Sequence, residues 1–180
     1  MLELVIPAGE AWDSENECFV IYKEQKLILE HSLVSLSKWE AKWNKAFLGK
    51  QNKTLEETLD YVRCMTVNSN VDPSVYFRLT EQDIKKINEY IDAPMTATRI
   101  RDTPQPMGAR DTVTSELIYY WMIACGIPFE CQKWHLNRLM MLIRVCNVKN
   151  TPPKKMSKKA LMSRNAALNA QRRKRLGSRG

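Results

Sequence analysis

The sequence predicts an α+β fold, in which a mainly helical single domain carries a small antiparallel β-sheet near its N-terminus. Three observations lead to this fold class. Runs of β-type residues fall within residues 1–30, apolar residues at helical spacing fill most of residues 37–148, and no acidic residue lies between Lys154 and Gly180. We therefore expect a globular domain over residues 1–150 and a basic C-terminal helix or arm over residues 151–180.

Three short runs near the N-terminus, Leu2–Ile6, Cys18–Tyr22 and Lys26–Glu30, are rich in β-branched, aromatic and aliphatic residues. Only residues 23–25 separate the last two runs, so we expect these to form a hairpin that the first strand joins. So small a sheet needs a helical cover to be stable.

Three helices are expected before residue 94, each opened by residues typical of an N-terminal capping box. Ser37–Glu40 opens a helix over about Lys38–Phe47, and Thr54–Glu57 opens the next. Thr80–Asp83 opens the third, which must end before Pro94 because proline cannot continue a helix. Beyond them, we expect a strand at Met95–Ile100 and a proline-containing loop at Thr103–Arg110.

The most apolar and aromatic stretch is Asp111–Val148, and we expect the other elements to pack on it. Gly126 and Pro128 end a first helix there, and a second begins near Glu130. The short connection predicts a central antiparallel helix hairpin. The N-cap candidates for its first helix are Asp111, Thr112 and Thr114.

The C-terminal region is set apart by its charge. It holds ten of the 28 Lys and Arg residues and none of the 20 acidic ones, so residues 1–153 are slightly acidic. A last helix is expected from Ser157, with a narrow apolar stripe of Ala160, Leu161, Ala167 and Leu168. The candidate partner-binding residues are Lys154, Lys155, Lys158, Lys159, Arg164, Arg172, Arg173, Lys174 and Arg175.

Three roles fit this basic segment: docking on an acidic protein, solvation of the chain end, or contact with nucleic-acid phosphates. The segment has no aromatic residue, which disfavours base stacking. We favour the first two roles over nucleic acid. Trp12, in the expected polar loop AWDSE, is the aromatic residue that we assign most readily to a partner interface.

No catalytic motif stands out, and we predict a protein that is not an enzyme and needs no cofactor. The chain has no G-x-S-x-G, no phosphate-binding glycine loop and no H-E-x-x-H. A zinc site of Cys125, Cys131, His135 and Cys146 is disfavoured because the C-x-x-C pairs of structural zinc sites are absent. The five cysteines are odd in number and irregular in spacing, which favours reduced thiols. No apolar run is long enough to span a bilayer.

Three segments, HSLVSLSKWEAKWNKAFL, TSELIYYWMIACGIPFECQKWHLNRLMMLIRVCN and KKMSKKALMSRNAALNAQRRKRLGSRG, together resemble a family of small proteins of long-tailed bacteriophages. Members are described as tail-assembly chaperones or tail structural proteins. The resemblance runs from about residue 31 to the end, and it carries no catalytic residue.

The resemblance implies a chaperone that binds the tape measure protein and presents it to tail-tube subunits, in the host cytoplasm during phage assembly. The alternative is a permanent virion subunit of the tail, neck or baseplate, and a homo-oligomer is compatible with either. A helical body with an exposed groove suits an amphipathic partner helix. The methionines suited to adaptable packing include Met107, Met122, Met140 and Met141.

Overall fold

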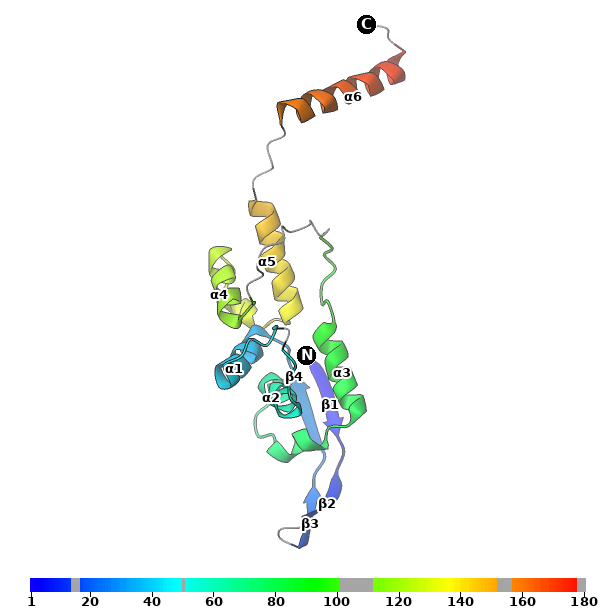
Figure 1. Cartoon of the computed structure of the whole chain (residues 1–180). Helices are drawn as coiled ribbons and strands as arrows, with labels where there is room; N and C mark the ends of the chain where they lie inside the picture. The colour runs from blue at the N-terminus through cyan, green and yellow to red at the C-terminus, as the bar shows by residue number, and fades with distance from the viewer. Residues whose placement is uncertain (14–16, 50, 101–111, 152–156, 178–180) are drawn as a thin grey trace. The chain divides into compact units, whose positions relative to one another are not determined.

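The computed structural model of the protein describes residues 1–13, 17–49, 51–100, 112–151 and 157–177 (Figure 1). The chain divides into two compact units, Met1–Val148 and Lys149–Gly180. The first unit combines a small β-structure with helices, so the predicted mainly helical α+β fold class is confirmed.

Four strands form one long two-stranded ribbon. β1 (Leu2–Ile6) pairs with β4 (Gln25–Leu29), and β2 (Gly9–Asp13) pairs with β3 (Cys18–Tyr22), both antiparallel. The ladder is interrupted at Pro7, which has no backbone N–H to donate. The predicted hairpin between residues 18–22 and 26–30 is therefore wrong, because β3 and β4 follow one another along the same side of the ribbon. Trp12, which was expected in a polar loop, lies in β2 instead.

The first helix, α1, spans Leu33–Trp43 and begins earlier than predicted. Its capping box is formed by Ser32 and Ser35, whose side chains each accept a hydrogen bond from the other's backbone N–H. The predicted box at Ser37–Glu40 does not form, because the Glu40 carboxylate accepts hydrogen bonds from Phe47 and Ser115 instead.

The next two helices begin where the sequence predicts. α2 (Leu55–Met65) opens with the Thr54–Glu57 capping box, and α3 (Glu81–Asp92) opens with the Thr80–Asp83 box and ends before Pro94. A 3₁₀ helix, η1 (Pro73–Arg78), connects them. α3 lies along β1, and the residues that follow α2 bridge to β4 (Figure 1).

Replacing Thr54 with alanine is expected to lower the free energy of unfolding by about 1 kcal/mol, the usual cost of losing an N-cap side chain. The Thr54 hydroxyl accepts the Glu57 backbone N–H at 3.2 Å, and alanine leaves that N–H without this partner. Chemical denaturation measures the loss. Thr54→Ser keeps the hydroxyl and should retain most of the stability, whereas equal losses in both variants would contradict the capping role.

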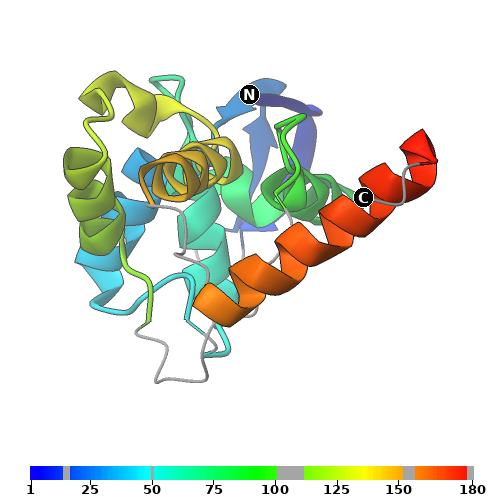
Figure 2. The same cartoon turned by 90° about the horizontal axis from the view of Figure 1, so that it is seen from above.

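Residues 115–150 form two neighbouring helices, but not the predicted antiparallel hairpin, because the C-terminal ends of both helices lie together. α4 spans Ser115–Ala124, and α5 begins only at Leu136 and runs to Asn150. Between them lies the 3₁₀ helix η2 (Phe129–Lys133). The Cys125 Sγ atom, just after α4, lies 3.6 Å from Asn147, near the end of α5. Residues 125–135 therefore return the chain from the C-terminal end of α5 to its N-terminal end, where α5 begins. Figure 2 shows α5 nearly end-on, with α4 lying beside it.

The element at the centre of the core is α1, rather than the stretch 111–148. α1 contacts α2, α4 and η2. Its Leu33, Leu36 and Trp39 side chains are fully buried, and the Trp39 indole N–H donates to the Glu57 carbonyl at 2.8 Å. The same core includes Leu4, Ile6, Leu27 and Leu29 of the ribbon, Ile87 of α3, Ile118 and Met122 of α4, and Leu139 and Ile143 of α5.

Residues 93–100 contain no strand, so the strand predicted at Met95–Ile100 is wrong. Among the described residues, no more than two strands pair at any point along the ribbon, and residues 65–67, at the end of α2 and just after it, lie along the outer edge of β4. The loop predicted at Thr103–Arg110 lies outside the described residues. In the second unit, α6 (Lys158–Leu176) forms the helix expected from Ser157. Within the described ranges, no helix is both long enough and apolar enough to cross a membrane.

Candidate protein-binding surface

The part of the ribbon formed by β2 and β3, here called the β-arm (Gly9–Asp13 and Cys18–Tyr22), exposes large apolar side chains on one face. Trp12 is opposite Phe19, and Glu10 is opposite Ile21. Opposed residues and residues two apart share a face, so Trp12, Phe19 and Ile21 form one patch. These side chains are 53%, 64% and 80% exposed. The Trp12 and Phe19 rings meet edge to face, with centroids 4.9 Å apart.

The base of the β-arm is attached to the rest of the first unit through Arg78, the last residue of η1. Its guanidinium donates to the Pro7 carbonyl oxygen and lies over the Tyr22 ring, 4.8 Å from the ring centroid. A cation over an aromatic face is attractive. The contacts hold the arm where it leaves β1 and β4, while the Trp12–Phe19 pair lies farther along the ribbon.

The β-arm has two open edges as well as an open apolar face. β2 pairs only with β3, and no other backbone hydrogen bond involves these strands in the described part of the chain. An isolated two-stranded ribbon is marginally stable in water, and its unpaired edge groups accept a further strand readily. Large exposed apolar patches in folded proteins commonly mark interaction sites.

Other surfaces also expose apolar groups, including Leu55 of α2 and Phe77 of η1. On α4, the Tyr120 and Ile123 side chains are each 63% exposed. Beside α5, a groove of about 510 Å³ is lined by seven residues, which are Trp121, Asn137, Met140, Met141, Ile143, Arg144 and Asn147. Two of the four methionines assigned to adaptable packing therefore line a groove. Met122 is instead fully buried in the core, and Met107 lies outside the described residues.

The predicted partner-binding residues fall in two different units. Trp12 lies on the β-arm, in a strand rather than in a loop. The basic residues within α6 are all exposed, namely Lys158, Lys159, Arg164, Arg172, Arg173, Lys174 and Arg175. Lys154 and Lys155 lie outside the described residues.

Sequence reasoning missed Phe19 and Ile21 as surface residues. The run CFVIY was interpreted as a strand of a covered sheet, and its apolar character agreed with that interpretation. A signal was present in Gly9–Asp13, because Glu10 and Trp12 alternate with small residues as a ribbon requires. The sequence alone does not show which strand pairs with Gly9–Asp13. The exposed face of the β-arm therefore became evident only from the register of the ribbon.

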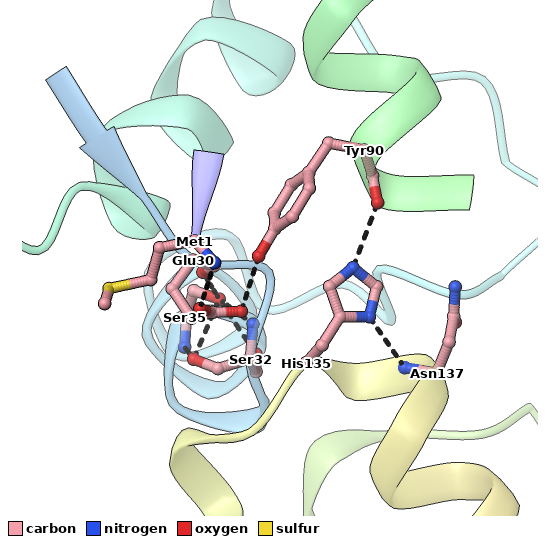
Figure 3. Close-up of polar contacts among 7 residues, drawn as sticks. All are labelled: Met1, Glu30, Ser32, Ser35, Tyr90, His135 and Asn137. Carbon is pink, nitrogen blue, oxygen red and sulfur yellow. Dashed lines mark hydrogen bonds and ion pairs between the residues drawn. The ribbon is translucent and has the colours of Figure 1, made fainter. Parts of the chain in front are cut away.

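The two histidines lie together inside the first unit, in a polar network that joins α1, α2, α3 and α5. His31 Nδ1 lies 2.6 Å from the Tyr61 hydroxyl, and the His31 and His135 ring centroids are 5.1 Å apart. Tyr90 donates its hydroxyl to Glu30 at 2.7 Å, and Glu30 also meets the Met1 amino group at 3.3 Å (Figure 3).

The partners of His135 indicate its tautomer. Its Nε2 atom lies 3.0 Å from the Tyr90 carbonyl oxygen, which can only accept, so Nε2 carries the hydrogen. Its Nδ1 atom accepts the Asn137 backbone N–H at 3.3 Å (Figure 3). Both ring nitrogens are thus occupied by protein groups. Because His31 and His135 are only 2% and 7% exposed, this network serves packing rather than contact with a substrate.

The cysteines do not gather around a metal position. Cys131 is buried, Cys18 is exposed, and all five are free thiols. Burial raises the pKa of the Cys64 thiol, which disfavours its reactive thiolate form. Among the described residues, no group of three or more His, Cys, Asp or Glu side chains is arranged to hold a metal ion.

The arrangement offers an apolar binding surface on the β-arm, a Met-lined groove beside α5 and a basic helix. No family model matches the sequence, and neither a curated protein nor a solved structure matches the chain.

Proposed function

We propose that this protein is a tail-assembly chaperone of a long-tailed bacteriophage, which binds the tape measure protein reversibly. The observation that carries a binding function is the apolar face of the β-arm, where Trp12, Phe19 and Ile21 are exposed side by side. The resemblance of the segments from His31 onward supports the assignment to phage tail assembly.

The chemistry of the arm suits an apolar, helix-rich partner. Trp and Phe supply large contact areas at small entropic cost and are frequent among the residues that dominate binding energy. A partner helix with an apolar stripe can lie on the face of Trp12, Phe19 and Ile21, and water is then removed from both surfaces. Because these side chains are not in the core, they are available for binding without unfolding the first unit.

Replacing Trp12, Phe19 and Ile21 together with threonine is expected to weaken binding to a tape measure fragment by at least about tenfold, since tenfold corresponds to only 1.4 kcal/mol. Threonine keeps the β-propensity of the arm and removes most of the apolar area. Binding is measured by calorimetry, and the melting temperature should change little. The matched control is Tyr120→Ser with Ile123→Ser, which removes exposed apolar groups from α4. If only the α4 variant loses binding, the arm is not the binding surface.

Quantitative mass spectrometry of gradient-purified phage particles separates a chaperone from a permanent subunit. Suitable peptides come from residues 39–63 and 134–144. A chaperone should be abundant in infected-cell lysate and missing from particles. Fixed stoichiometric amounts in the particles would instead make the protein a virion subunit of the tail, neck or baseplate.

A further inference from the structure

The part of the chain that lacks acidic residues is longer than the C-terminal segment alone. Glu130 is the last acidic residue, so residues 131–180 contain 14 of the 28 Lys and Arg residues and none of the 20 Asp and Glu residues. Residues 1–130 hold the other 14 basic residues together with all 20 acidic ones. This basic part of the chain includes α6, whose described side chains are all exposed.

The positive charges of α6 surround the whole helix. At 100° per residue, Lys159, Arg175 and Arg172 lie about 100°, 260° and 320° around the axis from Lys158. Lys174 lies near 160°, opposite Arg172. The helix has 19 residues and is therefore about 28 Å long. A partner that satisfies these charges must be anionic on more than one side of the helix.

Basic residues interrupt the predicted apolar stripe of α6. Leu161 and Leu168 share a side, but Arg172 and Arg175 lie within about 40° of them at 100° per residue. A protein groove that received this side of the helix would bury guanidinium groups, which is costly unless each is paired. Helix-in-groove binding to another protein is therefore disfavoured.

The exposed acidic residues of the first unit lie on several different elements, among them Glu3 of β1, Glu56 of α2 and Glu89 of α3, so a second copy would meet α6 with scattered charges. Glu30, Glu40, Glu57 and Asp60 are bonded to other elements, and Asp72 and Asp83 cap helices. The charges of α6 thus favour a partner of another kind. Nucleic acid carries closely spaced phosphates, and the B-DNA major groove admits an α-helix between its two phosphate walls.

We propose that α6 binds duplex DNA by entering the major groove, with basic groups on its different sides meeting phosphates of both strands. The absence of aromatic residues in α6 fits a duplex, whose bases remain stacked and are not available as stacking partners. Binding of this kind depends on phosphates and is independent of base sequence. This property is separate from tape measure binding, which relies on the β-arm.

Fluorescence anisotropy of a labelled mixed-sequence duplex, titrated with the full-length protein at several salt concentrations, tests the proposal. The logarithm of the binding constant should fall linearly with the logarithm of salt, with a slope of about −0.9 for each phosphate neutralised. In the variant R172Q/R173Q/K174Q/R175Q, we expect affinity at low salt to fall at least about 30-fold and the slope to flatten by about 3. Glutamine is a good helix former, so circular dichroism should be unchanged.

The matched control removes four exposed lysines of the first unit in the variant K23Q/K38Q/K85Q/K86Q. Its net charge equals that of the α6 variant. If α6 has a specific role, this control variant should bind duplex DNA with an affinity within about threefold of that of the unmodified protein. Equal losses in both variants would reduce the effect to net charge and overturn the proposal. No binding to duplex DNA, or tighter binding to single-stranded RNA or to an acidic protein, would overturn it as well.

Discussion

Replacing Glu40 with alanine is expected to lower the free energy of unfolding by about 3 kcal/mol, because a buried backbone donor left unpaired costs about 1–3 kcal/mol. Glu40 is a buried residue of α1. One carboxylate oxygen accepts the Phe47 N–H at 2.8 Å, and the other accepts the Ser115 N–H at 2.7 Å. Alanine removes both acceptors at once.

The Ser115 bond has a second consequence, because Ser115 is the first residue of α4. The Thr114 side chain makes no capping hydrogen bond, so the distant Glu40 carboxylate serves this helix N-terminus instead. A negative charge there also interacts favourably with the helix dipole. Glu40 therefore links α1 to α4 through a charged hydrogen bond between residues far apart in sequence.

Urea denaturation of the Glu40→Ala variant measures the loss. Glu40→Gln retains one carbonyl oxygen and should keep about half of the stability that alanine removes, since only one of the two donors stays paired. Glu89→Ala removes an exposed carboxylate from α3 and should change stability by less than about 0.5 kcal/mol. A loss below about 1 kcal/mol for Glu40→Ala would show that water or rearrangement satisfies both donors.

Acidification is expected to destabilise the protein through His31. Burial, and then the nearby His135 ring, lower the pKa of His31 from 6.5 to about 4. The groups that face His31 are the Tyr61 hydroxyl of α2 and the His135 ring before α5, with the Glu30 carboxylate beside it in sequence. That carboxylate is bonded to the Tyr90 hydroxyl and the Met1 amino group.

The direction of the effect follows from proton binding. Between the folded pKa of about 4 and the unfolded value of 6.5, the unfolded chain binds more protons at this site. The stability that neutral His31 contributes is therefore fully present above pH 6.5, and it is lost as the pH falls toward 4. The loss between pH 7.5 and pH 5 should be about 2 kcal/mol, and it should approach about 3 kcal/mol near pH 4.

Denaturation curves from pH 7.5 to pH 5 check this expectation. His31→Gln replaces the titrating ring, so that variant should lose about 2 kcal/mol less than the unmodified protein over this range, while being less stable at pH 7.5. The pKa values of Asp60 and Asp72 are lowered, so the stability that these carboxylates contribute is lost only at lower pH. The change in stability between pH 7.5 and pH 5 therefore comes mainly from His31. Parallel pH profiles for the two proteins would contradict the role of His31.

Local sequence determined the elements whose signals lie within a few neighbouring residues. The starts of α2 and α3 were predictable because each capping box is completed within four residues, and Pro94 limits α3 in the same local way. The extent of α6 was predictable because Lys, Arg and Ala favour helix even without a packing partner.

Tertiary structure decided the features in which one residue had two possible partners. Glu40 completes a capping-box pattern with Ser37, yet it bonds to Phe47 and Ser115, so α1 starts at Leu33 instead. The return segment 125–135 is likewise fixed at long range, because the Leu136 N–H donates to the His31 carbonyl at 2.7 Å.

The β-arm shows the same division most clearly. The strand at Cys18–Tyr22 was predictable from its own residues, since they favour extended backbone. Only the fold decided that this strand pairs with Gly9–Asp13 and that Trp12, Phe19 and Ile21 stay exposed. The reason is physical: a strand's own residues set its backbone preference, whereas its register and its burial depend on which distant segments pack beside it.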